Sequence, residues 1–411
     1  MAVDVTITRS DQASEWPDGV LDVSALRVGG WRPVPFRQFL FKVHSRCNLA
    51  CDYCYVYEMA DQSWRSRPIT MQASVVSQAA VRIAEHVRQH DLNEVRVILH
   101  GGEPLMAGAD FFAQAAKTLR AAVPEGCKLE FGMQTNAVLL TEQFLEVLLE
   151  HRIRVGVSLD GERSANDRHR RYANGRSSYD QVITGLRLLK QERYAPLFTG
   201  LLCTIDLDND PVATYEKLLA FAPPSMDFLL PHGNWSALPP RRDTDPASAP
   251  YGDWLIRIFD RWYNAPRRET GIRFFEEIIN LVLGGRSHVE SIGLTAVNLI
   301  VVEADGTLEQ VDSLKAAFDG APATGLNVFD HAFDMALEHP AVAARQMGVD
   351  GLCQTCRQCQ IRDICGGGLY PHRYRAGSGF LNPSVYCPDL LRLITHIRDR
   401  VQADVESIPR S

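Results

Sequence analysis

The alternation of strand-like and helix-like segments between residues 36 and 263 restricts the fold more than any other feature of the sequence. Short runs of apolar and β-branched residues alternate with longer segments whose apolar residues recur every three or four positions. Strands are predicted at 36–43, 94–100, 128–135, 154–159, 197–205 and 226–231. Helices are predicted at 71–89, 110–123, 141–151, 179–192, 212–222 and 251–263. Consecutive β-α units favour a parallel sheet that closes into a barrel or part of one, and about six of the eight units of a full barrel are visible.

The pattern changes after residue 285. The segment "AVNLIVVEADGTLEQVD" at 296–312 predicts a β-hairpin that turns at Asp305-Gly306. A cysteine-rich segment follows it, and then a helix predicted at 388–405. We therefore expect an α/β protein with an N-terminal segment (1–35), a partial barrel (36–285) and a smaller C-terminal domain (286–411).

Composition and charge argue against several classes of function. The formal net charge of the 411-residue chain is -7 and no basic block stands out, so nucleic acid is not expected as a partner. No apolar run approaches the length that spans a membrane, and the first residues lack the apolar core of a signal peptide. We therefore expect a cytoplasmic protein without membrane contact. In that compartment, ten cysteines favour metal or redox chemistry over disulfides.

Unusual polar residues follow the C-terminal ends of the predicted strands. Cys47, Cys51 and Cys54, spaced C-x3-C-x2-C, follow the first strand, and "HGGEPL" at 100–105 follows the second. In a parallel barrel the loops after these strand ends form the active site, so the residues are expected to lie together. The later strands end in Thr135-Asn136, "SLDG" at 158–161, Thr204 and "PHGNW" at 231–235.

Three closely spaced cysteines suit an iron–sulfur cluster. Such clusters take cysteine thiolates, normally four, and a four-iron cluster with three protein ligands leaves one iron open to a small chelating molecule. Zinc bound by the same three cysteines would need a fourth ligand, for which His44 is a candidate. The spacing and the aromatic-rich flank are not typical of zinc sites, so a cluster is the favoured interpretation.

The cysteine triplet, with Tyr53 before its last member, resembles the signature of the radical S-adenosylmethionine (SAM) superfamily. Gly101-Gly102-Glu103-Pro104 resembles the GGEP motif of the same superfamily. The resemblance implies a partial (β/α)6 TIM-like barrel in which the three cysteines hold a [4Fe–4S] cluster. SAM would bind the open iron through its amine and carboxylate. Its reductive cleavage would give methionine and a 5′-deoxyadenosyl radical, which abstracts hydrogen from an unactivated C–H bond.

The same resemblance implies particular contacts with SAM. Gly101, Gly102 and Glu103 would meet its amino group, Tyr53 its adenine ring and Ser158 its ribose. Arg170 falls where relatives carry an arginine for the SAM carboxylate, although a surface position in the basic segment "NDRHRR" is an alternative. The further candidates for cofactor contacts are Pro104, Gln134, Thr135, Asn136 and Thr204.

A second group of cysteines resembles the SPASM extension of radical SAM enzymes that modify peptides. Cys356-x2-Cys359-x5-Cys365, followed by Cys387, matches the ligands of the second auxiliary cluster of that extension. The three cysteines of the first auxiliary cluster are missing: Val311 and Leu369 fill two of their places, and none stands nine to fifteen residues before Gly306. The resemblance therefore implies a SPASM/twitch-like lobe with one auxiliary [4Fe–4S] cluster, for which Cys353 is a spare thiol. A structural zinc knot is the alternative.

Three further segments, "DGTLEQVDSLK", "CGGGLYPHRY" and "NPSVYCPDL", resemble the FxsB-like branch of radical SAM/SPASM peptide maturases. This resemblance covers nearly the whole chain. It implies a ribosomally made precursor peptide as substrate and a cyclophane as product, in which an aromatic ring carbon is joined to a β-carbon. The missing cysteines argue against the dehydrogenases that make formylglycine in sulfatases, which use the full set. The alternatives are thioether formation, epimerisation or decarboxylation of a peptide, a zinc scaffold without turnover, and a barrel that has lost SAM cleavage.

The implied mechanism needs an electron acceptor and a base. The deoxyadenosyl radical would take a β-hydrogen, the carbon radical would add to an aromatic ring, and loss of one electron and one proton would restore aromaticity. The auxiliary cluster is the expected electron acceptor. Asp312 is the candidate base, and a surface position in the hairpin is its alternative. His232, His372 and Arg373 are candidates to touch the peptide.

The expected partners are the precursor peptide and an electron donor such as a ferredoxin or flavodoxin. The chain has 46 residues before Cys47 and 24 after Cys387. Neither segment is long enough for a winged-helix domain that binds a leader peptide. Leader recognition is therefore expected to be direct or to be supplied by a separate protein.

Overall fold

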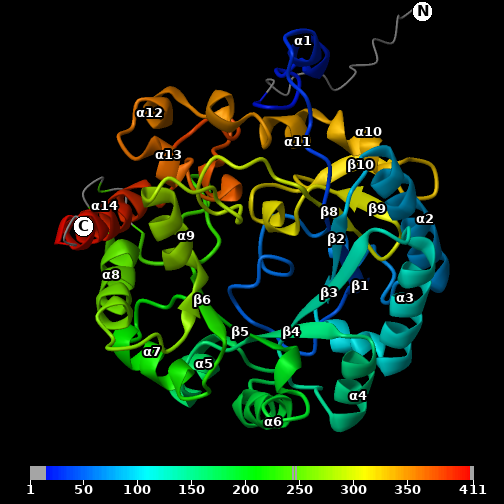
Figure 1. Cartoon of the computed structure of the whole chain (residues 1–411), viewed down its shortest axis with the longest axis horizontal. Helices are drawn as coiled ribbons and strands as arrows, with labels where there is room; N and C mark the ends of the chain where they lie inside the picture. The colour runs from blue at the N-terminus through cyan, green and yellow to red at the C-terminus, as the bar shows by residue number, and fades with distance from the viewer. Residues whose placement is uncertain (1–14, 243–244, 246–247, 408–411) are drawn as a thin grey trace, which may run out of the picture.

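Ten strands form one continuous sheet that curves around the centre of the molecule (Figure 1). The computed structural model describes residues 15–242, 245 and 248–407, so residues 1–14 of the predicted N-terminal segment lie outside the described part. The order of the strands in the sheet is β10-β9-β8-β1-β2-β3-β4-β5-β6-β7. The strands are β1 (Gln38–His44), β2 (Glu94–Gly101), β3 (Lys128–Thr135), β4 (Ile153–Ser158), β5 (Phe198–Thr204), β6 (Ser225–Leu229), β7 (Gly271–Ile272), β8 (Leu299–Val302), β9 (Thr307–Glu309) and β10 (Ala323–Asn327).

Strands β1 to β7 run parallel, as the succession of β-α units predicts. The six predicted strands are confirmed, with ends that differ by at most two residues. Strand β7 was not predicted, because its two residues are too few to show a period. The fold is thus the expected α/β part-barrel, in which the C-terminal strand ends lie along one edge of the sheet.

Helices cover the outer face of the parallel part of the sheet (Figure 1). The six predicted helices are confirmed, with ends that differ by at most three residues: α2 (Ala73–Gln89), α3 (Ala109–Ala122), α4 (Glu142–Glu150), α6 (Tyr179–Leu189), α7 (Pro211–Leu219) and α8 (Pro250–Tyr263). Helices α5 (Arg163–His169) and α9 (Arg273–Val282) were not predicted. Helix α5 is too short and too polar to show an apolar period, and α9 lies beyond the last predicted unit.

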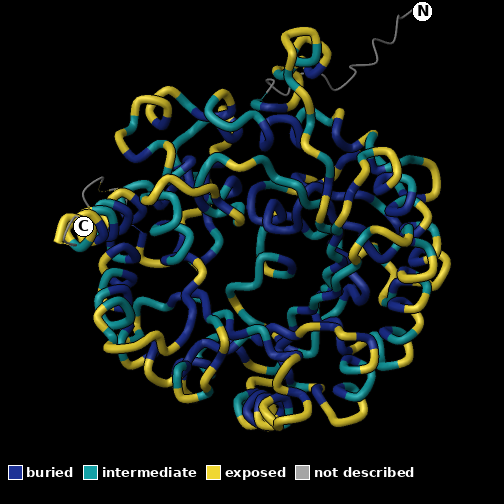
Figure 2. The backbone as a smooth tube through the Cα atoms, viewed as in Figure 1, coloured by how far each residue is buried: buried dark blue, intermediate teal, exposed yellow. Residues whose placement is uncertain are grey.

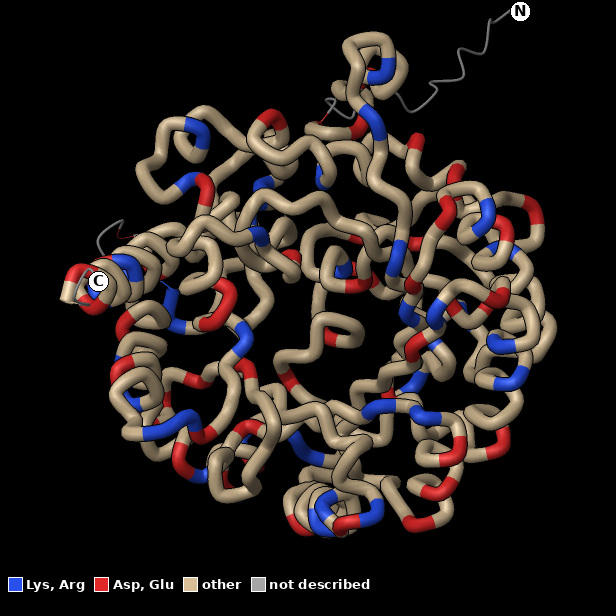
Figure 3. Tube along the Cα trace, viewed as in Figure 1, with Lys and Arg blue, Asp and Glu red and all other residues tan. Residues whose placement is uncertain are grey.

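The main apolar core lies between the sheet and the helical layer (Figure 2). On α2, Val76, Ala80 and Ile83 stand three or four residues apart and are at most 3% exposed. Strand β1 is buried along almost its whole length and contributes Phe39 and Phe41 to the same core. Charged residues of both signs are spread along the outer helices (Figure 3). Among the described residues, no helix combines the length and the apolar character needed to cross a membrane.

The C-terminal residues extend the same sheet. Strand β8 pairs in parallel with β1, and β9 runs back antiparallel to β8, which confirms the predicted hairpin. Gly306 in its turn has a φ of +86°, a conformation that favours glycine. Because the sheet continues past residue 286, hydrogen bonds join the barrel to the C-terminal part. The division of the chain at that residue stays a prediction.

Short helices after the sheet build a C-terminal lobe along the upper side of Figure 1. They are α10 (Phe333–Leu337), α11 (Pro340–Ala344), η5 (Gly348–Gly351), α12 (Gln354–Arg357), α13 (Arg362–Cys365) and η6 (Tyr370–Arg373), whereas η4 (Asp312–Ala316) lies between β9 and β10. The predicted C-terminal helix is confirmed as α14 (Cys387–Ser407), which packs against α8 and α9. The remaining short helices are α1 (Val23–Val28), η1 (Ser63–Arg65), η2 (Pro104–Ala107) and η3 (Ala195–Leu197).

Candidate active site

The three N-terminal cysteines line one pocket of about 220 Å³ at the C-terminal ends of the parallel strands. Hydrogen-bond donors point at Cys47 Sγ: the Leu49 amide nitrogen lies 3.4 Å away and the Asn136 side-chain nitrogen 3.8 Å away. Hydrogen bonds to sulfur are one of the ways in which proteins tune iron–sulfur clusters. The loop after β1 therefore presents its thiols as the sequence predicts.

Burial controls the protonation of these thiols. It raises the pKa of Cys47 to about 12 and the pKa of Cys51 to about 11. Such thiols stay protonated near neutral pH unless a cation compensates the charge of the thiolates. Three partly buried thiols, with donors aimed at the sulfur of Cys47, fit a cluster of iron ions, which supplies that positive charge.

The two glycines of the GGEP motif allow β2 to approach the cysteine loop. A Cβ atom on Gly101 would lie 2.3 Å from the carbonyl oxygen of His44. A Cβ atom on Gly102 would lie 2.5 Å from the carbonyl oxygen of Arg46 and 1.8 Å from the Tyr57 hydroxyl. Backbone cannot move aside cheaply at such distances. The close approach of the backbone thus requires glycine at both positions, independently of any contact with a cofactor.

Glu103 ties the ends of two neighbouring strands together. Its carboxylate accepts hydrogen bonds from Thr135 Oγ1 at 2.6 Å, Asn136 N at 2.8 Å and Leu105 N at 3.1 Å. Burial raises the pKa of Glu103 in spite of these donors. Pro104 follows it as the buried first residue of η2. The acidic residue of the motif therefore shapes the pocket wall, and its proposed contact with SAM stays a prediction.

Arg170 is buried at the pocket, with 8% of its surface exposed, so its alternative as a surface arginine is wrong. Its guanidinium donates a hydrogen bond of 2.7 Å to the Tyr53 hydroxyl, which donates to Asp160. Asp160 also accepts the amide of Thr204 at 3.0 Å. Among the described residues Arg170 Nε has no partner although it is buried. An unpartnered buried donor beside the cysteines fits an anionic ligand such as the SAM carboxylate.

The remaining predicted cofactor residues also line this pocket. Gln134 donates through Nε2 to Ser158 Oγ at 2.9 Å, and Asn136 donates to Asn48 at 2.7 Å. Ser158 and Thr204 end two adjacent strands, so parallel pairing brings them together. Their expected contacts with SAM stay predictions. Asp160, which joins Tyr53 to Thr204, was not singled out, although it lies in the strand-end segment "SLDG" that sequence reasoning had noted.

Asp312 is buried in η4 and is 5% exposed, so its alternative as a surface residue of the hairpin is wrong. Its Oδ2 accepts Lys42 Nζ at 3.0 Å and the Tyr55 hydroxyl at 2.9 Å. Burial alone would raise the pKa of Asp312, but the charge of Lys42 and these hydrogen bonds lower it well below its usual value. The carboxylate is therefore ionised. Tyr55 lines the pocket and connects Asp312 to it.

Lys42 and His100 complete this group, and the sequence analysis missed both. His100 Nδ1 lies 3.4 Å from Lys42 Nζ and 3.9 Å from Asp312 Oδ2. Burial, followed by the charge of Lys42, lowers the pKa of His100 to about 4 and keeps the ring neutral. A signal for Lys42 existed, since it is a charged residue inside the apolar strand segment "FLFKV".

The three candidates for peptide contact lie at different places. His232 lines the pocket beside Tyr55, with ring centroids 4.7 Å apart. His372 lies behind His232 at 5.7 Å and is 2% exposed. Arg373 lies in the C-terminal lobe, where its guanidinium donates to the carbonyl oxygens of the triglycine loop 366–368 at 2.6 to 3.0 Å. We therefore assign Arg373 to that loop and not to the substrate.

The C-terminal cysteines converge on a second, smaller cavity of about 50 Å³, which is lined by Cys356, Cys359, Cys365 and Cys387. Cys353 stands at the N-terminus of α12, where a hydrogen bond with Cys356 lowers its pKa. Four thiols around one cavity fit a four-cysteine cluster or a zinc ion. The structure thus brings the predicted auxiliary ligands together, and Cys353 stays a reserve.

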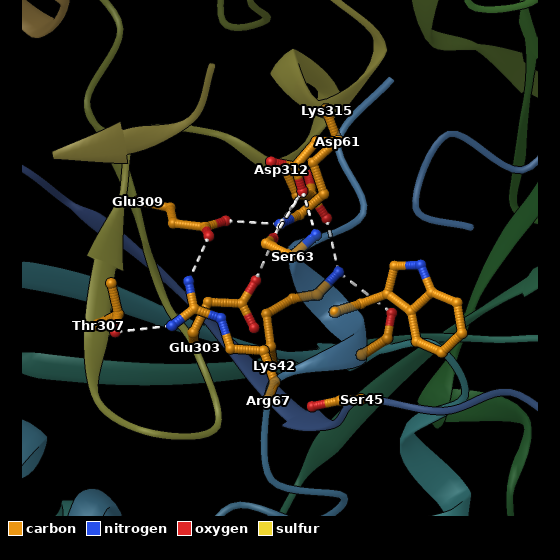
Figure 4. A network of polar contacts seen from close by, with 12 residues as sticks. Lys42, Ser45, Asp61, Ser63, Arg67, Glu303, Thr307, Glu309, Asp312 and Lys315 are labelled. Carbon is orange, nitrogen blue, oxygen red and sulfur yellow. Dashed lines mark hydrogen bonds and ion pairs between the residues drawn. The ribbon is translucent and has the colours of Figure 1, made fainter. Parts of the chain in front are cut away.

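A buried network of charges lies between the hairpin, the loop after β1 and η4 (Figure 4). Lys315 is 1% exposed, and its Nζ lies 3.0 Å from Glu309, 3.4 Å from Glu303 and 3.5 Å from Asp61. Arg67 also reaches Glu309 at 3.0 Å. Burial and the charge of Glu303 raise the pKa of Glu309 to about 7. Val311, which stands in one of the places of the missing cysteines, belongs to a separate apolar cluster with Leu314, Tyr370 and Phe380.

Comparison with known proteins gives matches over most of the chain. Residues 41–218 match the profile of the Radical SAM superfamily. Over 362 residues the chain is 25% identical to a serine-type anaerobic sulfatase-maturating enzyme of Klebsiella aerogenes, with 86% of this chain and 84% of that enzyme covered. It is 23% identical over 357 residues to a cysteine-type anaerobic sulfatase-maturating enzyme of Clostridium novyi, with 84% and 90% covered.

Solved structures show the same fold. Native anSMEcpe with bound AdoMet is 22% identical and has a TM-score of 0.74, with 90% of this chain and all of that chain covered. Streptococcus suis SuiB bound to the precursor peptide SuiA is 14% identical and has a TM-score of 0.57, with 89% and 78% covered. These likenesses support the fold predicted from the sequence, a part-barrel with a C-terminal lobe.

Proposed function

Because this chain is an enzyme of the radical SAM superfamily, we propose that it modifies a ribosomally synthesised peptide by joining an aromatic ring carbon to a β-carbon. The observation that carries the proposal is the convergence of the cysteine triplet, the GGEP segment and Arg170 on one pocket. A peptide as substrate is supported by relatives named sulfatase-maturating enzymes and by the fold shared with peptide-bound SuiB. The choice of a crosslink rests on the FxsB-like sequence segments.

The residues of the pocket fit the cofactors of the superfamily. Cys47, Cys51 and Cys54 would hold the [4Fe–4S] cluster, and Arg170 with Tyr53 would meet the polar groups of SAM. When bound, the cluster and SAM together supply a 5′-deoxyadenosyl radical that removes hydrogen from carbon. The apolar pocket residues Leu49, Val56, Leu202, Leu229 and Leu230 offer a surface against which an aromatic side chain of the peptide would pack.

Asp312 and Tyr55 are proposed to accept the proton that the ring must lose. Asp312 is ionised, and the Tyr55 hydroxyl that donates to it lies at the pocket. A proton released at the ring would reach Asp312 through this hydroxyl, because Tyr55 can donate one proton while it accepts another. Lys42 would hold the carboxylate in place and keep it ionised before the proton arrives.

The test is product analysis with the peptide encoded beside the gene. The anaerobically reconstituted enzyme is incubated with SAM, a reductant and this peptide, and the product is sequenced by fragmentation mass spectrometry. We expect the loss of two hydrogens and the absence of fragments between the two joined residues. A product with unchanged mass would indicate that the enzyme epimerises the peptide and does not crosslink it. A peptide left unmodified while SAM is cleaved would refute the proposed substrate.

Oxidation of a serine or cysteine side chain to an aldehyde is the second candidate, because the curated relatives named above are sulfatase-maturating enzymes. Serine oxidation also removes two hydrogens, but it leaves a linear peptide with an aldehyde. A hydrazide reagent labels the aldehyde and leaves a cyclophane unlabelled. The absence of three auxiliary ligands favours the crosslink. A ferredoxin-like electron donor, a leader-binding partner and the cytoplasmic location stay predictions.

A further inference from the structure

Four aromatic rings connect the two cysteine sites of this chain. Tyr55 follows Cys54 directly in sequence, and Tyr386 directly precedes Cys387. Between them stand His232 and His372. The ring centroids are 4.7 Å apart from Tyr55 to His232, 5.7 Å from His232 to His372 and 4.9 Å from His372 to Tyr386. Each pair meets edge to face at the separation of aromatic rings in contact.

The ends of this row reach the two predicted cofactor sites. Tyr55 and His232 line the large pocket, which also holds the first three cysteines. Tyr386 is fully buried and precedes Cys387, which lines the smaller cavity. Its hydroxyl donates to the carbonyl oxygen of Pro231 at 2.6 Å, which fixes the loop that carries His232. The row is thus anchored to the barrel at one end and to the C-terminal lobe at the other.

The histidines in this row lack an ordinary structural reason. Among the described residues, His232 Nδ1 and His372 Nε2 are buried and have no hydrogen-bond partner. Burial without a partner costs free energy that a leucine or phenylalanine would avoid. Burial also lowers the pKa of His232 to about 4, so the ring stays neutral. Neutral rings in contact form a packed π path without a charge that would trap an electron.

We propose that this row of rings, formed by Tyr55, His232, His372 and Tyr386, is a path along which one electron moves between the radical SAM cluster and the auxiliary cluster. This inference rests on the proposed function for its purpose. Loss of the ring proton to Asp312 would leave one electron on the substrate, and a cluster held by the C-terminal cysteines would accept it. Passing one electron back along the row would replace the one that each cleavage of SAM consumes.

The missing first auxiliary cluster gives such a path its reason. Two of its cysteine places hold Val311 and Leu369, whose side chains cannot bind iron. Any electron that leaves the pocket must therefore cross protein to reach the second set of cysteines. Rings in contact couple two redox sites better than saturated side chains do, because their π electrons are less tightly held.

The test measures electron transfer directly and uses no peptide. The cluster-loaded enzyme is reduced with titanium(III) citrate, freed of reductant and mixed with SAM. Freeze-quench electron paramagnetic resonance then follows the signal of the reduced auxiliary cluster, and methionine is counted in parallel. In the unaltered enzyme we expect a fast first equivalent of methionine. A second equivalent should form as the auxiliary signal decays.

Three variants at one position separate a ring from a hydrogen-bonding group. His372→Phe keeps the ring without nitrogens, His372→Gln keeps polar atoms without a ring, and His372→Leu keeps neither. We expect decay in His372→Phe close to the unaltered rate and a several-fold slower decay in the other two, with the first methionine equivalent unchanged. If a variant at His372 loses iron, the same set at His232 repeats the test on the decay rate of the auxiliary signal alone, because His232 lines the pocket.

Three outcomes would overturn the proposal. The first is a signal of the reduced auxiliary cluster that persists in the unaltered enzyme. The second is a decay of this signal in His372→Leu that is as fast as in the unaltered enzyme. The third is a fast decay in His372→Gln together with a slow decay in His372→Phe. The last would assign the histidine to hydrogen bonding. Because no peptide is present, failure of the path leaves the proposed peptide chemistry untouched. Likewise, a peptide that stays unmodified does not alter the electron-transfer result.

Discussion

Replacement of Lys315 by methionine tests whether the buried ion network stabilises the C-terminal part of the sheet. Lys315 Nζ lies between 3.0 and 3.5 Å from three carboxylates and is 1% exposed (Figure 4). Lys315→Met keeps most of the length of the side chain but leaves these carboxylates without their central cation. Removing one partner of a buried ion pair costs roughly 3–5 kcal/mol. That is a large part of a total stability of roughly 5–15 kcal/mol.

The loss should depend on pH in a defined direction. Burial and Glu303 raise the pKa of Glu309 from 4.5 to about 7, so between these values the folded state binds more protons than the unfolded state. Stability therefore falls as pH rises through this window. Without Lys315 the carboxylates hold their protons more strongly still. The defect of Lys315→Met should thus be larger at about pH 8 than at about pH 5.

The assay is anaerobic urea unfolding of the cluster-loaded enzyme, followed by tryptophan fluorescence. Lys128→Met is the matched control, because Lys128 also meets two carboxylates, Glu94 and Glu130, but is 64% exposed. Water screens that pair, so we expect a far smaller change in the free energy of unfolding. If Lys315→Met is no less stable than Lys128→Met, the network does not stabilise the fold and the reasoning fails.

Three further predictions test the pocket and the auxiliary site. Gly102→Ala should abolish iron binding by the N-terminal cysteines, because its Cβ would lie 2.5 Å from a backbone oxygen. Gly132→Ala is the control and should keep the iron, because the space around its Cβ is open. Iron analysis after reconstitution distinguishes the two results. Asp312→Asn should stop peptide modification while methionine release continues, since it removes the proposed base but no SAM contact; product at the unaltered rate would dismiss that role. Cys356→Ala should lose about four irons and Cys353→Ala none. Full iron in Cys356→Ala would make Cys353 the replacement ligand.

The secondary structure of the barrel was predictable because the spacing of apolar residues within each segment identifies it as a helix or a strand. Apolar residues at helical spacing on α2 and a continuous apolar run in β1 identify these elements without knowledge of their neighbours. Elements that escaped prediction carry little local signal. Helix α5 has seven mostly polar residues, and β7 has two. Their places depend on the rest of the sheet.

By itself, the sequence determined the β-α succession, the strand ends at which polar residues gather, and the two sets of cysteines that meet in two cavities. These features follow from spacing along the chain. Only the tertiary structure decided which charges are buried and what they face. Asp312 meets Lys42 from 270 positions away, and Arg170 meets Tyr53 from 117 positions away. The state of a buried charge depends on such distant partners, because in low dielectric a single contact outweighs local preference.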